Sequence, residues 1–200
     1  MFISFFIGGV IALQTALNLE SPFIPKSLIG FAAKRSIILE FAPTFCSIIL
    51  AGKVGSYITS SIGTMRVTEQ IDALEVMGIN SLNHLVLPKI LATVFFYPFL
   101  IALAMVLGIF GGWIAGVLSG LFSGVDYVVG LQTDFNPFLV TYAIIKTLVF
   151  AFLIATVPSY HGYYTSGGAL EIGRSSTKSV VYTSIVILII NYVLTQLLLL

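Results

Sequence analysis

Five apolar runs, each close to the length that crosses a lipid bilayer, constrain this chain more than any other feature. A helix needs about 20 mainly apolar residues to span the hydrocarbon core. Of the 200 residues, 58% are hydrophobic and only 8% are charged, whereas soluble domains have about 25% charged residues. We therefore predict an all-α integral membrane protein in which a single domain covers 1–200. The predicted transmembrane helices are about 2–19, 41–62, 89–118, 137–157 and 180–200, with a two-proline loop at 21–25.

Small residues recur at four-residue spacing inside the predicted spans. One series contains Gly108, Gly112 and Gly116, and another runs from Ser47 through Gly55 and on to residue 63. Small side chains on one helical face let two helices approach closely in lipid. We expect both series to pack against neighbouring helices, and the spacing by itself indicates no further function.

The stretch 63–80 is the one sustained run in which charge is dense and follows a helical period. We predict a short amphipathic helix over about 67–78, with Thr68 as its N-cap and Gly78 ending it in a left-handed conformation. Helices that lie on a membrane surface are typically rich in Lys and Arg. Since this helix carries mainly carboxylates, we expect it to dock onto another protein. Its apolar face holds Val67, Ile71, Leu74 and Met77, and its charged residues are Arg66, Glu69, Asp72 and Glu75.

Loop charge predicts the orientation of the chain in the membrane. The positive-inside rule favours a cytoplasmic position for the loops that carry Arg66, Lys89, Arg174 and Lys178. The loop 123–136, which has two Asp and no Lys or Arg, then lies outside. The polar segment before the second span also falls outside, against the rule, because it contains Lys26, Lys34 and Arg35.

Lys146 lies about nine residues into the fourth predicted span. An unpaired ammonium group is costly in hydrocarbon, so this side chain should face the helix bundle or a wet cavity. Glu40, at the mouth of the second span, is a candidate partner, although a carboxylate there can also reach the interface by itself. A functional pair of charges inside the membrane is therefore one hypothesis.

Several chemistries are unsupported by the sequence. The run GALEIGRS at 168–175 imitates a phosphate-binding loop, but predicted membrane helices flank it in place of the strand and helix that the motif requires. We therefore expect no ATPase site, no enzymatic activity and no cofactor bound by this chain. His84 and His161 lack further metal ligands at helical spacing. A net charge of +1 argues against nucleic-acid binding.

The sequence GTMRVTEQIDALEVMGI, together with EFAP, AGKVGS and GRSSTKSVV, resembles the MlaE (YrbE) family of ABC-transporter permeases. EFAP and AGKVGS are similar to the family's ELGP and AGRxGS, and the resemblance covers nearly the whole chain. It implies a permease homodimer in the bacterial inner membrane that moves phospholipids between inner and outer membranes. It also implies cytoplasmic ATPase subunits, which use ATP and dock on the 63–80 helix, and a periplasmic MCE-domain ring.

The same resemblance implies roles for individual residues. Leu39 stands where the family usually has Arg, which favours Lys146 as the partner of Glu40. A lipid pocket formed near the dimer axis by the first two spans would involve Gln14, Leu39, Glu40 and Lys146. The residues implied in ATPase coupling are Arg66, Glu69, Asp72, Leu74 and Glu75.

Two other functions compete with this interpretation. An ion- or proton-coupled secondary transporter could use Lys146 and Glu40 as a relay, but such transporters have inverted repeats, and the sequence shows no self-similar halves. A purely structural membrane subunit would explain the glycine series but would leave the acidic helix without a role. A nucleotide-binding partner in the purified complex would distinguish the three.

Overall fold

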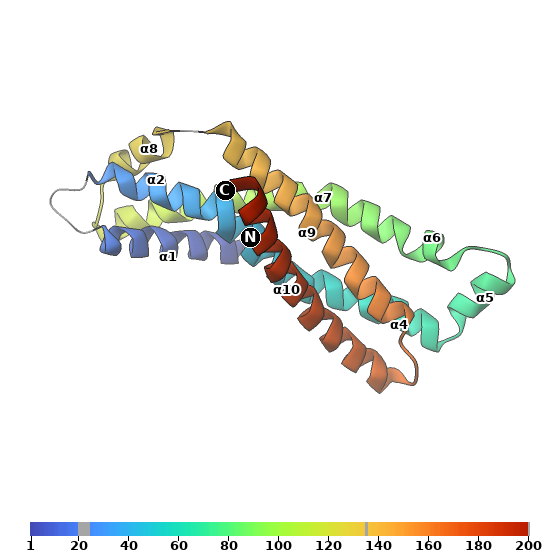
Figure 1. Ribbon diagram of the computed structural model, residues 1–200. Coiled ribbons are helices and arrows are strands. Elements are labelled where there is room, and N and C mark those ends of the chain that lie inside the picture. Colours follow the sequence, from blue (N-terminus) through green and yellow to red (C-terminus); the bar gives the residue numbers. More distant parts are fainter. Residues whose placement is uncertain (20–24, 135, 200) are drawn as a thin grey trace. The chain divides into compact units, whose positions relative to one another are not determined.

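The computed structural model describes residues 1–19, 25–134 and 136–199, and this part of the chain contains helices and no strand (Figure 1). The predicted all-α class is confirmed. By length and composition, four helical stretches can cross a membrane, and the 17-residue apolar helix α1 is slightly shorter. The four stretches are Ser27–Val67, Ser81–Ser119, Pro137–Tyr163 and Ala169–Leu198. The predicted loop at 21–25 lies outside the described residues, apart from Pro25.

The helical elements follow one another with short connections. In chain order they are α1 (Phe2–Asn18), α2 (Ser27–Ser36), η1 (Ile37–Phe45), α3 (Cys46–Leu50), η2 (Ala51–Gly55), α4 (Ser56–Val67), α5 (Gln70–Val76), α6 (Ser81–Leu85), α7 (Leu87–Ser119), α8 (Gly124–Gln132), α9 (Pro137–Tyr163) and α10 (Ala169–Leu199).

The second predicted span is part of one continuous helical stretch from α2 to α4, interrupted by the π-helical segments η1 and η2. Pro43 lies inside η1. Proline lacks an N–H and its ring crowds the carbonyl one turn earlier, so it disrupts the regular α-helical hydrogen bonds at this point. Since α2 begins at Ser27 and η1 continues it, the polar segment before residue 41 is helical from Ser27 onward.

Two predicted loops are also largely helical. The acidic loop 123–136 contains α8, whose N-cap Ser123 accepts a hydrogen bond from the N–H of Val125. The loop between the fourth and fifth spans is shorter than predicted, because α9 continues to Tyr163 and α10 already starts at Ala169. Ser, Thr and charged residues lowered the hydropathy of these turns, but they did not stop the helices.

The chain forms two compact units, and the first comprises Met1–Cys46 and Phe99–Ile145. In this unit α1 and α7 meet at glycines: a Cβ on Gly8 would overlap the backbone of Gly108, and one on Gly111 would overlap that of Phe5. Gly112 lies beside the Tyr127 hydroxyl, where a Cβ would come within 2.5 Å of it. The glycines therefore permit backbone contact between helices, as small residues do in lipid.

Helix α8 packs against α2 in the same unit (Figure 1). Lys34 of α2 is 3% exposed, and its Nζ donates hydrogen bonds to the carbonyl oxygens of Leu131 (3.0 Å) and Thr133 (2.9 Å). These carbonyls belong to the C-terminal end of α8, where helices leave acceptors unsatisfied. Tyr127 of α8 is completely buried, and burial raises the pKa of its hydroxyl to about 12.

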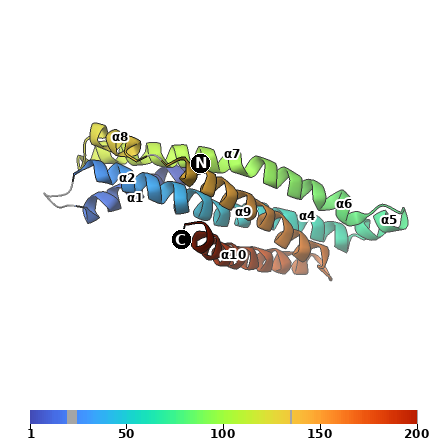
Figure 2. The ribbon, with the colours of Figure 1, turned by 45° about the horizontal axis from the view of Figure 1, so that its top comes forward.

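The second unit comprises Ser47–Pro98 and Lys146–Leu200. In it α4 runs alongside α10, as Figure 2 shows. The small-residue series predicted to face another helix is buried here at all of its positions. Thr59 Oγ1 lies 2.9 Å from the carbonyl oxygen of Pro158 and 2.8 Å from Ser179 Oγ. The members of the buried series are Ser47, Ala51, Gly55, Thr59 and Gly63.

Candidate functional site

The short helix α5 and the residues that hold it form the candidate functional site. Ile71 is completely buried and joins Ile58 and Ile62 of α4 in one apolar cluster. This contact attaches α5 to the end of the preceding apolar helix. The charged residues of α5 remain on the exposed side of the cluster.

The start of α5 differs from the predicted capping pattern. Thr68 is not its N-cap: it ends α4, and its hydroxyl donates to the carbonyl oxygen of Thr64 at 2.8 Å. Glu69 is the residue before α5, with a left-handed φ of 59° and no capping hydrogen bond from its side chain. Because α4 continues to Val67, only two residues remain for the turn. At the other end Gly78 has φ 76°, so the predicted left-handed exit is confirmed.

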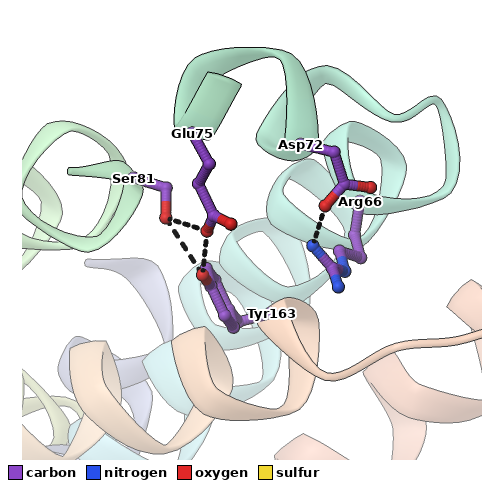
Figure 3. A network of polar contacts seen from close by, with 5 residues as sticks. All are labelled: Arg66, Asp72, Glu75, Ser81 and Tyr163. Carbon is purple, nitrogen blue, oxygen red and sulfur yellow. Dashed lines mark hydrogen bonds and ion pairs between the residues drawn. The ribbon is translucent and has the colours of Figure 1, made fainter. Parts of the chain in front are cut away.

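Glu75 is directed back toward the second unit's own helices (Figure 3). Its Oε1 accepts hydrogen bonds from Tyr163 Oη and from Ser81 Oγ, both at 2.9 Å, and these two hydroxyls lie 3.0 Å apart. The hydrogen bond from Tyr163, followed by the one from Ser81, lowers the pKa of the Glu75 carboxyl group. We call Glu75, Ser81 and Tyr163 the Glu75 node, and it joins α5, α6 and the C-terminal end of α9.

Arg66 and Asp72 form a second contact beside this node (Figure 3). Arg66 Nη1 lies 2.6 Å from Asp72 Oδ1, and the Arg66 guanidinium carbon lies 5.8 Å from the centre of the Tyr163 ring. Such pairs fix a side-chain geometry more than they add stability when they are exposed. Two of the three carboxylates predicted to face a partner therefore have partners within this chain.

The surface that α5 leaves open is part acidic and part apolar. Glu69 is exposed, Leu74 is partly exposed, and Val76 and Met77 are 89% and 64% exposed. Met77 was expected on one apolar face with Ile71, but α5 ends at Val76, and Met77 is exposed whereas Ile71 is buried. An amphipathic helix can bind in a groove of another protein through apolar side chains, and Val76 and Met77 are exposed apolar side chains at this end of α5.

Sequence reasoning did not find Tyr163 or Ser81. Tyr163 lies 88 residues from Glu75 and was placed in an interhelical loop. No local pattern links residues at such separations, because only the packing of α9 beside α4 and α5 brings them together. Asn80, whose side chain accepts from the N–H of Asn83 at 3.1 Å, marks the start of α6 and was the one local signal there.

The residues implied in a lipid pocket lie in several places. Gln14 is exposed on α1, Leu39 and Glu40 are partly exposed in η1, and Lys146 is completely buried in α9. Glu40 Oε2 accepts a hydrogen bond from Thr44 Oγ1 at 3.2 Å. The burial of Lys146 fits the expectation that it does not face lipid.

The first unit contains a crevice between α1, η1 and α7. It is lined by residues that include Ser4, Gly8, Ile37, Phe41 and Gly108, and its volume of about 10 Å³ has room for about one water molecule. None of the four residues implied in lipid binding lines it. The crevice marks a place where small residues bring helices together, and it is too small for a phospholipid.

Comparison with known proteins agrees with this architecture. A family model described as Permease MlaE matches residues 1–197. A probable ABC transporter permease protein of Rickettsia bellii is 38% identical over 194 residues, which are 97% of this chain and 74% of that protein. The intermembrane phospholipid transport system permease protein MlaE of Haemophilus influenzae is 30% identical over 191 residues, covering 95% of this chain and 73% of that protein.

A more distant relative comes from a plant. The chloroplastic protein TRIGALACTOSYLDIACYLGLYCEROL 1 of Arabidopsis thaliana is 29% identical over 196 residues, which are 96% of this chain and 55% of that protein. The matches to bacterial permeases extend over nearly all the helices described above. The chain therefore belongs to the MlaE family of ABC-transporter permeases, multi-pass membrane subunits that have no ATPase activity of their own and work with separate ATPase subunits.

Proposed function

We propose that this chain is the permease of a transporter that moves phospholipids between the inner and outer membranes of a bacterium. The observation that carries the proposal is the helix α5, which lies outside the long apolar helices and is tied to one of them through Tyr163. The Haemophilus relative, whose name is intermembrane phospholipid transport system permease protein, supports phospholipid as the cargo.

In this proposal the two sides of α5 have different tasks. The ATPase subunit contacts the exposed or partly exposed side chains at α5, which are Glu69, Leu74, Val76 and Met77. Arg66, Asp72 and Glu75 contribute to coupling by holding α5 at a defined angle. A fixed angle matters because a docking helix transmits movement only when it cannot swing freely.

Movement would pass from α5 to the transmembrane helices. When the ATPase subunits close on ATP, they displace α5, and the Glu75–Tyr163 contact carries the displacement to the end of α9. Such a displacement can bias a set of packed helices between two arrangements. One arrangement would accept lipid and the other would release it.

Charge reversal tests the docking role. We expect Glu69→Lys combined with Asp72→Lys to separate ATP hydrolysis from lipid transport in the reconstituted complex while the permease stays folded. Asp126→Lys on α8, which lies in the other compact unit, is the control and should leave both activities unchanged. If the double variant copurifies with full ATPase stoichiometry and transports normally, the docking role of α5 is wrong.

The lipid pocket is a separate part of the proposal. We infer that Gln14, Leu39, Glu40 and Lys146 contribute to it, with Glu40 and Lys146 acting as a pair. Glu40 lies in the π-helical segment η1, and such segments frequently mark functional sites. Lys146 is a buried cation in an apolar helix, a position that is usually functional in membrane proteins.

A charge-swap cycle tests the pair. Neutralising Lys146 alone should reduce transport more than neutralising both residues, because the single change leaves a carboxylate without its partner. The matched control is Lys53→Gln, which alters an exposed cation of the same continuous helical stretch as Glu40. A swap of Glu40→Lys with Lys146→Glu that transports no better than either single variant would remove the pairing.

The subunit composition of the transporter is also proposed from the resemblance to MlaE-family permeases. We propose a permease homodimer in the bacterial inner membrane, with two ATPase subunits and a periplasmic MCE-domain protein as partners. Mass spectrometry of the purified complex should find two permease copies, the ATPase, the MCE protein and bound phospholipid together. A complex that holds a single permease copy would contradict the homodimer.

A further inference from the structure

A groove at the junction of α9 and α10 has no role in the function proposed above. Its volume is about 400 Å³. Three tyrosines, Tyr160, Tyr164 and Tyr182, line it together with the cations Arg174 and Lys178. All of these residues belong to the second compact unit. We call this feature the basic–aromatic groove.

The charge of the groove is positive. Arg174 Nη1 pairs with Glu171 Oε1 at 2.7 Å, so the charges of these two residues largely compensate each other. Lys178 is exposed, and the described part of the chain shows no ion pair for it. Lys178 therefore supplies the uncompensated charge, and Arg174 keeps further N–H donors that the single contact with Glu171 leaves unused.

The aromatic rings are held in place by contacts with one another. The Tyr160 and Tyr164 ring centres lie 4.8 Å apart, and the His161 and Tyr182 rings stack at 5.3 Å. The three tyrosines are nevertheless 54–68% exposed. Tyrosines gather at the level of lipid headgroups because the ring is apolar and the hydroxyl is a hydrogen-bond donor. The groove thus combines interfacial rings with a cation.

The groove lies at the same end of the second unit as α5, because the neighbouring Tyr163 donates its hydrogen bond to Glu75. If α5 binds the ATPase, this end faces the cytoplasm; the leaflet assigned here rests on that proposed function. Anionic lipids give the cytoplasmic leaflet a negative surface potential that attracts Lys and Arg. Beyond Tyr182, the exposed side chain of Ile185 continues along α10 as an apolar surface for an acyl chain.

We propose that the basic–aromatic groove binds the phosphate group of an anionic phospholipid from the cytoplasmic leaflet. Lys178 and Arg174 bind the phosphate oxygens, the tyrosine hydroxyls donate to the headgroup, and the acyl chains lie along α10. This lipid is distinct from the transported one. It would hold the end of α9 at the membrane surface, where Tyr163 positions α5.

Native mass spectrometry of the delipidated permease–ATPase complex tests the proposal. The complex is titrated with phosphatidylglycerol and, separately, with phosphatidylcholine. The double variant Arg174→Gln, Lys178→Gln removes two cations and leaves Glu171 uncompensated, so it should bind phosphatidylglycerol roughly thirtyfold more weakly. The control Lys26→Gln, Arg35→Gln changes two exposed cations of the other unit and should bind as the wild type does.

A gain-of-binding variant guards against a simple folding defect. Glu171→Gln releases Arg174 and should strengthen phosphatidylglycerol binding roughly fivefold, which a misfolded protein cannot do. Equal binding by the double variant and the wild type would overturn the site. Displacement of the lipid by an equal concentration of inorganic phosphate would assign the groove to free phosphate and overturn the lipid assignment.

The two proposals fail in different ways. ATPase stoichiometry is measured in the same spectra. If charge reversal on α5 leaves the ATPase bound and transport normal while the groove variants lose phosphatidylglycerol, the lipid site stands and its leaflet assignment falls. If the groove variants bind phosphatidylglycerol normally, the groove proposal falls and the coupling role of α5 is unaffected.

Discussion

Lys34 has a structural role that its position in the sequence does not indicate. In the sequence it is one of three cations that oppose the predicted orientation, whereas in the structure it is buried and closes the C-terminal end of α8. We expect Lys34→Met to lower the free energy of unfolding by about 1–3 kcal/mol, because two carbonyl groups lose their donor. Thermal unfolding in detergent measures this loss.

The neighbouring cation provides the control for this prediction. Arg35 is exposed, so Arg35→Met removes the same charge without opening a buried hydrogen bond and should change stability by less than about 0.5 kcal/mol. Equal unfolding temperatures for the two variants would show that Lys34 does not hold α8.

Glu75 should make the position of α5 depend on pH in the acid range only. The pKa of the Glu75 carboxyl group is lowered in the folded protein. The hydrogen-bonded carboxylate therefore contributes its full stabilisation when the pH is above the pKa that Glu75 has in the unfolded chain, and this contribution is lost as the pH falls through the lowered pKa of the folded state. A nitroxide at Met77→Cys, in a Cys46→Ala background, should therefore stay immobile from neutral pH down to mild acid and loosen below it. The same label in a Glu75→Gln variant should show no pH dependence; a matching acid transition there would exclude Glu75 as its cause.

At the scale of elements, glycines decide how closely α1 and α7 pack. A Cβ at Gly8 would overlap the backbone of Gly108, which cannot move as a side-chain end can. We expect Gly8→Ala to destabilise the protein by several kcal/mol or to prevent folding, since overpacking costs about 1–3 kcal/mol even where side chains can shift. The yield of monodisperse protein and its thermal unfolding measure this effect.

Gly173 offers a matched substitution in α10, because a Cβ there meets nothing within 4 Å. Gly173→Ala should be neutral or slightly stabilising, by up to about 1 kcal/mol, because alanine favours a helix more than glycine does. Similar losses at both positions would show that the close contact of Gly8 with Gly108 is not the reason why Gly8→Ala destabilises the protein.

At the scale of the whole molecule, Tyr163 links α5 to the long apolar helix α9. Tyr163→Phe removes the hydroxyl that donates to Glu75 and keeps the ring beside Arg66. We expect the complex to keep its ATPase subunits and its rate of ATP hydrolysis within about twofold, while lipid transport per ATP falls roughly threefold to tenfold, the effect of losing a hydrogen bond worth about 1 kcal/mol.

Tyr192→Phe is the control for this change, since the Tyr192 side chain is 67% exposed on α10 and does not line the basic–aromatic groove. It should leave the ratio of transport to hydrolysis unchanged. An unchanged ratio in Tyr163→Phe as well would show that movement reaches α9 by another route.

The sequence by itself determined the all-α class, the apolar helices, the left-handed turn at Gly78 and the family. Those properties depend on composition, on local periodicity and on short motifs, which are all readable along the chain. It could not determine that Glu75 and Asp72 have partners within the chain, or that Lys34 is buried. Hydrogen bonds from Tyr163 and Ser81 to one carboxylate oxygen require helices that are distant in sequence to pack side by side. Only the tertiary structure decided which charges of α5 stay available for a partner, because pairing depends on distances that no local pattern contains.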